Sequence, residues 1–545
     1  MQKHKYIFVI GGVMSGVGKG VTTSSLAKIL QARGFDLNAI KIDPYLNVDA
    51  GTMNPVEHGE VFVLDSGLEC DQDMGNYERF LGQSLPAENY MTSGMVYKYV
   101  IDKERALGYG GKCVDPVPYI SEEILRRIKA STDKTKADIT IVEIGGTVGE
   151  YQNAIFIEAA RILKLRHPND VLFVLVSYLP VPNKIGEMKT KPTQYAVRSL
   201  NSYGVHPDII IARSDRPLDK KRKEKLAFAS NVPADNIISA PDVESIYDIP
   251  LNFEKDGLSG TILKLLHLKP KTTNIMEWQQ MVTRLKGSTK PVRIAIVGKY
   301  FKTGDFVLSD VYISVIESLK HAAGALGKKL EIAWLDSGDY ETDGKKLKDL
   351  ADYDGILVPG GFGERGVEGK IRVIEYAREH GLPYFGLCYG MQLLVIEFAR
   401  HVAGLKGAHT TEVNPESKFP VIDIMPEQKK NLRQESYGGT MRLGAYPAWI
   451  KSGTVAFAAY REAQISERHR HRYEVNPEFI PQLVAKGLVF SGTSPDGRLM
   501  EIAELPKTVH PFFVGTQFHP EFKSSPLKPH PLFVNFIKAA SHHRK

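Results

Sequence analysis

The cysteine at position 388 stands in a pattern that favours nucleophilic chemistry. It is one of three cysteines in the chain and lies in Tyr384-Phe-Gly-Leu-Cys-Tyr-Gly-Met-Gln392. A short apolar run ends here in Gly-x-Cys-x-Gly, and a helical pattern follows over Met391–Arg400. Glycines on both sides tolerate a sharp strand-to-helix turn and let a substrate approach the backbone closely. The pattern predicts a nucleophilic thiol on such a turn.

A candidate base for this thiol lies far downstream. The segment Gln517-Phe-His-Pro-Glu-Phe522 places His519 two residues before a carboxylate, Glu521. An imidazole can take the thiol proton, and a carboxylate can orient the imidazole. Cys388, His519 and Glu521 therefore predict a Cys-His-Glu hydrolytic triad.

The chain opens with a candidate phosphate-binding loop. The strand-like run Tyr6–Ile10 leads into Gly11-Gly-Val-Met-Ser-Gly-Val-Gly-Lys-Gly-Val-Thr22, and a helical pattern follows over Thr23–Arg33. Glycines let backbone N–H groups converge on phosphate oxygens, and Lys19 adds a point charge. The match to the standard P-loop is imperfect, because the first glycine lies one residue too far from Lys19 and Gly20 takes the usual Ser/Thr position. A plain glycine-rich turn is the alternative, but the strand-loop-helix context favours phosphate binding.

Acidic groups near this loop are candidates for holding Mg²⁺, which prefers oxygen ligands. Asp71 and Asp73 lie in a polar stretch, and Glu143 ends the predicted strand Ile139–Val142. Carboxylates at the carboxyl ends of parallel strands face the ligand crevice. A solvated surface charge is the alternative for each residue, although an ionised Glu143 at an apolar strand end needs a partner.

Lysines mark a second candidate phosphate site. Lys41 ends another predicted strand, and Lys189-Thr-Lys-Pro-Thr-Gln194 forms a proline-interrupted loop after the predicted strand Val171–Val176. A lysine pair is usually a solvated face. Its place after a strand favours a second triphosphate site here.

Composition limits the class of protein. With 545 residues, 43% of them hydrophobic, the chain can form two or three domains. The first residues run straight into a strand, which predicts no secretory signal, and no apolar run approaches the roughly 18–20 residues of a membrane span. Three widely spaced cysteines make no disulfide framework, so we expect a cytoplasmic protein. A net charge of +7 is mild and permits polyphosphate binding.

The positioning elements read as two α/β halves. Short buried-strand runs alternate with amphipathic stretches, which favours parallel sheets with covering helices. We place the domains at 1–267 and 292–545, with a linker at 268–291 that includes a helical pattern over Ile275–Lys286. The strand Val292–Val297 begins the second half. The stretch 409–440 is expected to be an insertion or flap outside the core.

A run of basic residues, Arg468-His-Arg-His-Arg472, offers a nucleic-acid interpretation. It lacks interleaved aromatic residues and a wider basic field, so this interpretation is weak.

Taken together, the motifs resemble the cytidine triphosphate synthase family over residues 5–540. The resemblance rests on Gly11–Gly20, Lys41–Asn47, Glu57–Phe62, Glu143–Gly149, Lys189–Gln194, Pro359–Gly363, Gly439–Gly444, Arg468–Glu474 and Phe518–Phe522. It implies an N-terminal P-loop-like amidoligase domain with a parallel sheet, joined to a C-terminal class I glutamine amidotransferase α/β domain. The implied reaction is ATP-dependent amination of UTP to CTP through a 4-phosphorylated UTP, with ammonia released from glutamine.

The resemblance also implies residue roles in the second half. Cys388 attacks glutamine, His519 acts as base and then acid, and Glu521 orients the imidazole. Backbone N–H groups of Gly361 and Tyr389 form the oxyanion hole. Glutamine is recognised by Gly361, Phe362, Tyr389, Gln392, Glu412 and Arg472.

In the first half the resemblance implies three overlapping sites. ATP is held by Gly16, Val17, Gly18, Lys19, Gly20, Val21, Lys41, Asp73, Arg213, Pro241, Asp242 and Val243. Mg²⁺, the expected cofactor, is held by Asp73 and Glu143. UTP or CTP is held by Ser15, Glu150, Tyr151, Gln152, Lys189, Thr190, Lys191, Pro192, Thr193, Gln194 and Lys225.

Partners follow from the same resemblance. They are ATP, UTP and glutamine as substrates, CTP as product and feedback inhibitor, and GTP as an activator at Gly363–Gly366. The family forms homotetramers with a shared UTP pocket and can form filaments; no nucleic acid or membrane is expected. Three residues depart from the pattern: Tyr119 replaces a common histidine, Gln152 a common glutamate and Tyr389 a frequent leucine. The first two bear on inhibition by CTP.

Two alternatives remain at this point. One is another glutamine-dependent ATP ligase, such as a cobyrinic acid amidase, which lacks the motif Lys189–Gln194. The other is a catalytically silent, filament-forming paralogue, against which the intact catalytic and metal-binding candidates argue.

Overall fold

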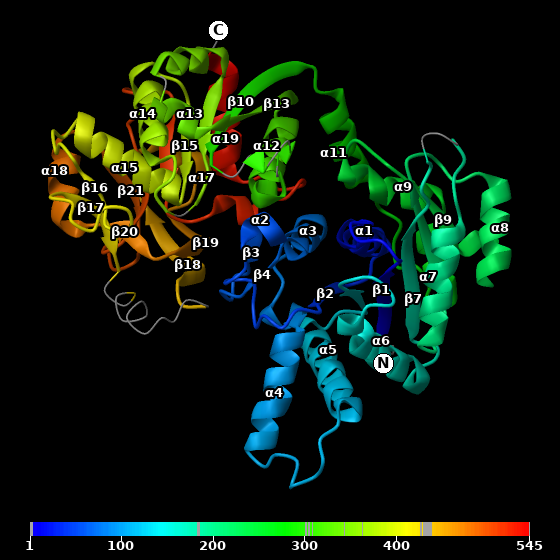
Figure 1. The fold of residues 1–545 in the computed structure, drawn as a ribbon. Helices are drawn as coiled ribbons and strands as arrows, with labels where there is room; N and C mark the ends of the chain where they lie inside the picture. The colour runs from blue at the N-terminus through cyan, green and yellow to red at the C-terminus, as the bar shows by residue number, and fades with distance from the viewer. Residues whose placement is uncertain are drawn as a thin grey trace. The chain divides into compact units, whose positions relative to one another are not determined.

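The computed structural model describes residues 4–182, 186–299, 302–303, 306–307, 309–342, 344–361, 363–425, 428 and 439–543. The chain forms two compact units (Figure 1). Unit 1 contains Met1–Ala50 and Asp73–Val282, and unit 2 contains Gly51–Gln72 and Thr283–Lys545. A short segment of the N-terminal half, Gly51–Gln72, thus packs with the C-terminal half.

Unit 1 is built on a seven-stranded parallel sheet with the order β5-β2-β6-β1-β7-β8-β9. Most of its strands are buried on both faces, as a parallel sheet covered by helices requires. The carboxyl ends of β1, β6 and β7, at the centre of the sheet, lead into the loops that carry the candidate nucleotide residues. The strands are β1 (Lys5–Gly11), β2 (Leu37–Asp43), β5 (Tyr90–Thr92), β6 (Ile139–Ile144), β7 (Val171–Tyr178), β8 (Ile209–Ser214) and β9 (Ile237–Pro241).

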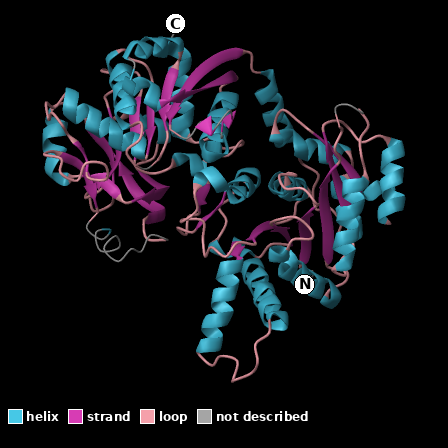
Figure 2. Cartoon of the chain, in the orientation of Figure 1, coloured by secondary structure: helices cyan, strands magenta, loops and turns pink. Residues whose placement is uncertain are grey.

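Helices cover both faces of this sheet (Figure 2). Residues of α4 to α8 share one core with Phe8, Ile10 and Val142, whereas α1 packs on α9 and α10. The helices are α1 (Lys19–Ala32), α3 (Gln72–Leu81), α4 (Ser93–Arg105), α5 (Ser121–Thr135), α6 (Tyr151–Arg166), α7 (Lys191–Ser202), α8 (Lys220–Ser230), α9 (Ile249–Lys255), α10 (Leu258–Leu265) and α11 (Met276–Gly287).

Unit 2 is built on a nine-stranded mixed sheet with the order β13-β10-β14-β15-β23-β22-β21-β18-β19. The first five strands are parallel and the last four pairings are antiparallel. The strands are β10 (Lys290–Gly298), β13 (Lys328–Asp336), β14 (Gly355–Val358), β15 (Tyr384–Leu387), β18 (Arg442–Ile450), β19 (Gln464–His471), β21 (Val489–Thr493), β22 (Met500–Glu504) and β23 (Phe513–Thr516).

Alternate side chains of β10 point to the two faces of this sheet. Ala295 and Val297 join a core with α14 and α15, and Ile294 and Ile296 join a core with α12, α17 and α19. The helices are α12 (Ile313–Ala325), α13 (Ser337–Thr342), α14 (Val367–Glu379), α15 (Tyr389–His401), α17 (Val455–Tyr460), α18 (Ile480–Ala485) and α19 (Pro531–His543).

Smaller elements complete unit 2. A three-stranded sheet has the order β16-β17-β20, and β11 pairs with β12. Within the segment Gly51–Gln72, a short helix precedes an antiparallel pair, β3 with β4. These elements are α2 (Pro55–His58), β3 (Val61–Val63), β4 (Glu69–Asp71), β11 (Lys302–Thr303), β12 (Phe306–Val307), β16 (His409–Thr410), β17 (Pro420–Ile424) and β20 (Tyr473–Val475).

Several predicted elements are confirmed to within two residues at each end. These are the strands now labelled β1, β6, β7 and β10 and the helix α11. The expectation for 409–440 is wrong in part: Val421 and Ile422 of β17 are fully buried in the core beside α15. Residues 426–427 and 429–438 of that stretch lie outside the described part of the chain.

The predicted loop Lys189–Gln194 is shorter than expected, because α7 already begins at Lys191. Proline is tolerated in the first turn of a helix, where its missing N–H has no intrahelical partner. Pro192 therefore starts this helix instead of interrupting it.

Candidate active site

Cys388 lies on a strained turn between β15 and α15. Its φ of 49° and ψ of −99° place a non-glycine residue in a sparsely populated backbone region. The neighbouring glycines are required by space: a Cβ on Gly390 would lie 2.3 Å from the carbonyl oxygen of Val358, and one on Gly386 would lie 2.6 Å from the Tyr384 hydroxyl. The turn predicted from the sequence is confirmed, and the cysteine on it is 5% exposed.

His519 reaches the same place from the neighbouring strand. β23 runs parallel to β15 with Leu387 opposite Thr516, so the residues that follow both strands emerge at one edge of the sheet. A Cβ on Gly360 would lie 3.0 Å from His519 Cε1 and 3.7 Å from Cys388 Cβ. The imidazole and the thiol-bearing carbon therefore flank the same glycine.

Glu521 holds the His519 imidazole. Nδ1 of His519 lies 2.7 Å from Oε1 of Glu521, and both side chains are buried. Burial alone would lower the pKa of His519, but the Glu521 carboxylate and the Cys388 sulfur outweigh it and raise that pKa to about 10. Nε2 of His519 is buried and makes no hydrogen bond within the described part of the chain. This nitrogen is thus available for proton transfer with the sulfur and the substrate.

A cavity of about 520 Å³ opens at the three residues. Cys388, His519 and Glu521 line it together with Gly361 and Arg472. A volume of this size matches a small-molecule site. The segment Gly51–Gln72 supplies further lining residues, namely Gly51, Thr52, Met53, Pro55, Glu60 and Val61.

Two arginines of the basic run, Arg468 and Arg470, form ion pairs between β19 and the segment Gly51–Gln72. Residues two apart in a strand share one face of the sheet, so Arg468 and Arg470 point to the same side. Nε of Arg468 lies 2.6 Å from Asp65, and Nε of Arg470 lies 2.8 Å from Glu69. The rings of Phe62 and Phe522 also pack edge to face at 5.0 Å. Glu57–Phe62 is one of the motifs that carry the family resemblance, but its place at the cavity was not predicted from the sequence. No local pattern indicates the contact.

The candidate glutamine-binding residues surround the same turn. Gln392 is buried and donates from Nε2 to the Tyr473 carbonyl at 2.9 Å, while its Oε1 has no partner in the described residues. Oε1 of Glu412 accepts the Gly363 N–H at 2.9 Å, and burial raises the pKa of this carboxyl. Nη1 of Arg472 donates to Gln428 at 2.8 Å. The predicted contact Phe362 lies outside the described residues.

The two candidate oxyanion donors are backbone groups of Gly361 and Tyr389. Tyr389 is the first residue of α15, where N–H groups have no intrahelical acceptor. Its hydroxyl donates to the Gly363 carbonyl at 3.3 Å, which ties the helix start to the loop after Gly361.

In unit 1 the candidate phosphate loop joins β1 to α1. Gly16 and Gly18 have φ of 68° and 78°, left-handed values that favour glycine. Nζ of Lys19 donates to the Gly146 carbonyl at 2.8 Å, and burial lowers the pKa of Lys19. Ser15 is exposed, whereas Val17 is buried. The loop thus has the strand-loop-helix geometry that its sequence predicts.

The ammonium group of Lys41 joins two of the predicted metal ligands. It forms ion pairs with Asp73 and with Glu143, the latter at 2.8 Å, and the Tyr77 hydroxyl donates to Glu143. Burial raises the pKa of Glu143 despite the nearby Lys41. A Cβ on Gly20 would lie 1.8 Å from Oδ1 of Asp73. Both carboxylates and Lys41 therefore meet at the start of α1. This oxygen-rich donor set fits Mg²⁺.

Residues at the ends of β8 and β9 lie beside the loop. Nη2 of Arg213 donates to Asp242 at 2.7 Å, and Nη1 would lie 2.9 Å from a Cβ on Gly18. Pro241 ends β9 directly before Asp242 and Val243. The structure thus brings the predicted ATP contacts at 213 and 241–243 to the phosphate loop.

Basic groups gather at the start of α7. Lys189 forms an ion pair with Glu187 at 2.6 Å. The hydrogen bond from Lys189 is the main cause that lowers the pKa of the Glu187 carboxyl, and the charges of Lys189, Arg222 and Lys225 add to this effect. Within the turn that follows, Gln194 donates to Thr190 at 3.1 Å, and Thr193 contacts Ser177 at the end of β7 at 2.9 Å. Of the predicted UTP contacts, Thr190 and Gln194 are thus joined at the start of α7.

The remaining predicted nucleotide contacts open α6. Glu150 accepts from Thr147 at 2.6 Å and from Gln152 at 3.0 Å, while Tyr151 is 97% exposed. Tyr119, which departs from the family pattern, packs against Tyr109 with ring centroids 4.8 Å apart.

Within the described residues, no helix is long and apolar enough to cross a membrane.

Two family models match the chain. The model described as CTP synthase N-terminus matches residues 5–268, and the one described as glutamine amidotransferase class-I matches residues 307–539. A CTP synthase of Pyrococcus furiosus is 50% identical over 543 residues, covering 99% of this chain and 98% of the relative. A CTP synthase of Thermococcus gammatolerans is 51% identical over 538 residues, covering 98% of each. The solved glutaminase domain of Trypanosoma brucei CTPS with bound acivicin is 38% identical, with a TM-score of 0.42, and covers 46% of this chain and 93% of that one.

Proposed function

The chain belongs to the CTP synthase family, a family of glutamine-hydrolysing carbon–nitrogen ligases, and we propose that it divides CTP synthesis between two chemically separate sites. One site, around Cys388 in unit 2, releases ammonia from glutamine. The other, around Lys19 in unit 1, activates UTP with ATP. The observation that carries the first assignment is the meeting of Cys388, His519 and Glu521 at one cavity.

The glutaminase reaction proceeds through a thioester. The Cys388 sulfur attacks the side-chain carbonyl carbon of glutamine, and backbone N–H groups of Gly361 and Tyr389 hold the oxyanion. His519 gives its proton to the departing nitrogen, so ammonia leaves and the thioester remains. Water, deprotonated by His519, then cleaves the thioester to glutamate and the free sulfur. Each oxyanion donor contributes roughly 3–4 kcal/mol to lowering such a barrier.

Specificity for glutamine comes from polar groups around the cavity. Gln392 offers an unpartnered Oε1, which can accept from the substrate, and Arg472 offers a cation at the cavity wall. Glu412, Phe362 and Tyr389 complete the proposed set.

The synthetase reaction activates O4 of the uracil ring. ATP transfers its terminal phosphoryl group to O4 of UTP, and ammonia then displaces phosphate at C4 to give CTP, ADP and phosphate. Lys19 and the loop N–H groups stabilise the transferred phosphoryl group. Asp73 and Glu143 would hold Mg²⁺, which when bound neutralises charge on the phosphate oxygens. Lys41 lies between these carboxylates and balances their charge.

The two nucleotides take different parts of unit 1. ATP uses the loop 16–21 with Arg213 and residues 241–243. The triphosphate of UTP uses the basic start of α7 with Ser15 and Lys225. CTP competes for this position through residues 150–152. The proposal includes a cytoplasmic homotetramer, activation by GTP at Gly363–Gly366, and domains at 1–267 and 292–545.

The proposed phosphorylated intermediate is tested by isotope transfer. UTP labelled with ¹⁸O at O4 is incubated with ATP, magnesium and ammonium salt, and the phosphate released is analysed by mass spectrometry. The proposal predicts that the label appears in inorganic phosphate as CTP forms. CTP formation with the label in water instead would contradict phosphorylation at O4.

A further inference from the structure

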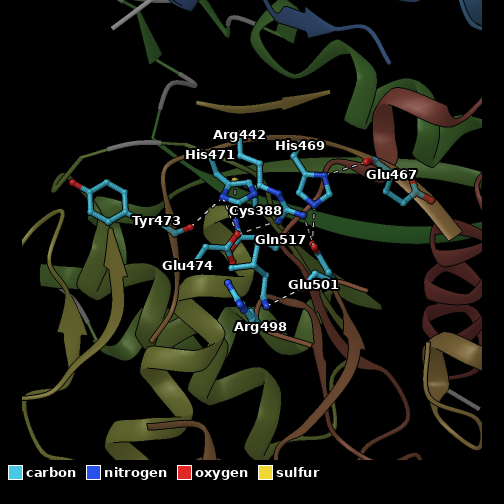
Figure 3. A network of polar contacts seen from close by, with 12 residues as sticks. Cys388, Arg442, Glu467, His469, His471, Tyr473, Glu474, Arg498, Glu501 and Gln517 are labelled. Atoms are coloured by element: carbon cyan, nitrogen blue, oxygen red, sulfur yellow. Dashed lines mark hydrogen bonds and ion pairs between the residues drawn. The ribbon is translucent and has the colours of Figure 1, made fainter. Parts of the chain in front are cut away.

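Gln517 lies between the candidate nucleophile and the glutamine-binding residue Gln392, and the proposed triad does not include it. It directly follows β23, two residues before His519, and its side chain is fully buried. Figure 3 shows it beside Cys388, among charged side chains that include Glu474, Arg442 and Glu501.

Both ends of its amide are engaged. Nε2 of Gln517 donates to the Cys388 sulfur at 3.7 Å, and Oε1 accepts from Nε2 of Gln392 at 3.3 Å. Gln392 also donates to the Tyr473 carbonyl at 2.9 Å. A continuous chain of hydrogen bonds therefore runs from a backbone carbonyl through both amides to the sulfur.

The direction of this chain is fixed by chemistry. A carbonyl oxygen accepts and cannot donate, so the Gln392 NH₂ group must face Tyr473. Its second hydrogen then faces an oxygen on Gln517, which leaves the Gln517 NH₂ group for the sulfur. Reversing either amide would oppose two acceptors or two donors.

The sulfur needs this donor most when it is ionised. As a thiol, Cys388 can donate to the Arg470 carbonyl at 3.8 Å. The thiolate has lost that hydrogen and faces a carbonyl dipole of the wrong sign. An N–H from Gln517 then offsets the repulsion, because a hydrogen bond to the charged form favours that form.

The backbone of Gln517 is restrained by a hydrogen bond to Glu501. Its backbone N–H donates to the Glu501 carbonyl at 2.9 Å, and the Glu501 carboxylate accepts from Arg442 and from His469, each at 2.7 Å (Figure 3). The side chains of Glu501 and His469 are fully buried, and that of Arg442 is 9% exposed. Both oxygens of the buried Glu501 carboxylate are thus satisfied, which restrains Glu501 and with it the backbone of Gln517.

We infer that Gln517 is a further catalytic residue of the glutaminase site: its amide donates to the Cys388 sulfur during attack and couples the sulfur to Gln392. The inference rests on the proposed role of Cys388. Binding of glutamine at Gln392 and readiness of the nucleophile are thereby linked through one side chain.

Two substitutions separate the effect of the N–H donated to the sulfur from the effect of side-chain shape. Gln517→Leu removes both hydrogen bonds, and Gln517→Glu keeps the shape and the acceptor for Gln392 but presents no N–H to the sulfur. Thr516→Val is the matched control: this neighbour is equally buried, and its hydroxyl donates to the Phe518 carbonyl at 3.0 Å and to no other described residue. All variants carry Cys113→Ser, since Cys113 is exposed and would react with alkylating agents.

The readouts are glutamine hydrolysis and the rate at which iodoacetamide alkylates Cys388 between pH 6 and 10. A hydrogen bond to a charged group predicts a loss of about tenfold to a hundredfold in kcat for Gln517→Leu, with the alkylation curve displaced to higher pH. Gln517→Glu is displaced further. A purely structural role predicts that Gln517→Glu alkylates within about twofold of Thr516→Val at every pH, which would overturn the inference.

Two controls keep the conclusions apart. Ammonia-driven CTP synthesis, which does not use this site, confirms that each variant is folded and assembled. Cys388→Ala is measured alongside: if it retains glutamine hydrolysis, the proposed nucleophile is wrong. If it loses hydrolysis and both Gln517 variants behave like Thr516→Val, only the role of Gln517 is wrong.

Discussion

Replacing Glu521 with glutamine removes one negative charge from the glutaminase site and keeps the shape of the side chain. The carboxylate lies 2.7 Å from the His519 imidazole, and it is the main group that raises the pKa of His519 to about 10 against the effect of burial. An amide oxygen can still accept the Nδ1 hydrogen. The substitution therefore tests charge and not position.

The size of the effect follows from the pKa of His519. A rise from 6.5 to about 10 corresponds to about 5 kcal/mol of added preference for the imidazolium. Glu521 and the Cys388 sulfur share this effect. If Glu521 supplies roughly half, its loss costs roughly 2–3 kcal/mol, or about a hundredfold in the rate of glutamine hydrolysis.

The pH dependence has a definite sign. Because the pKa of His519 is raised, the imidazolium persists until the pH rises through about 10, and proton donation to the leaving nitrogen persists with it. Without the carboxylate, burial lowers the pKa of His519. We expect the falling limb of the pH–rate curve to move to lower pH in Glu521→Gln.

The assay is glutamate release from glutamine between pH 6 and 10.5, with ammonia-driven CTP synthesis as a check on folding. The chain offers a matched control in Glu467, which lies 2.9 Å from Nε2 of His530 in an equally buried pair. Glu467→Gln removes the same charge from a similar pair without touching the triad. A Glu521→Gln enzyme that hydrolyses glutamine as fast as Glu467→Gln, with an unmoved falling limb, would refute the reasoning.

Three further predictions concern other buried or crowded residues. Burial lowers the pKa of Lys370 to about 7, so between pH 7 and 10.5 the unfolded chain binds a proton that the folded chain does not. Lys370→Met should therefore raise the free energy of unfolding, measured by urea denaturation, by a few kcal/mol at pH 7, and this gain should vanish near pH 10.5. A loss of stability at pH 7 would contradict this prediction. Gly20→Ala places a Cβ 1.8 Å from Oδ1 of Asp73, so one of the two residues must move. The substitution should lower ammonia-driven CTP synthesis about a hundredfold while glutamine hydrolysis persists. Equal losses in both assays would instead indicate general misfolding. Gln152→Glu restores the common family residue and should tighten inhibition by CTP, measured as the inhibition constant against UTP; an unchanged constant would argue against a role for residue 152.

The sequence was most informative where chemistry and local geometry coincide. The turn at Cys388 and the loop before Lys19 each join a strand to a helix, and glycine spacing, strand length and helix start lie within one short stretch of chain. Such features depend on backbone sterics that act over a few residues. The predicted fold class, two α/β halves, is confirmed by the two sheets and the helices that cover them.

Contacts between distant segments were harder to foresee. Nothing local indicates that Gly51–Gln72 packs with unit 2 or that Arg468 and Arg470 pair with Asp65 and Glu69, because such pairs depend on the whole topology. The burial of β17 is similar: the charged composition of 409–440 concealed a short apolar strand. Gln517 escaped notice because an amide carries no charge and gains meaning only from its neighbours.

The central claim is that Cys388 serves as an ammonia source for a separate synthetase site. It is tested most directly by measuring CTP formation in Cys388→Ala with glutamine and, in parallel, with ammonium chloride. The account predicts that glutamine-driven synthesis is abolished and that ammonia-driven synthesis stays near the wild-type rate. Glutamine-driven synthesis that survives the substitution, or loss of both activities in a folded protein, would contradict it.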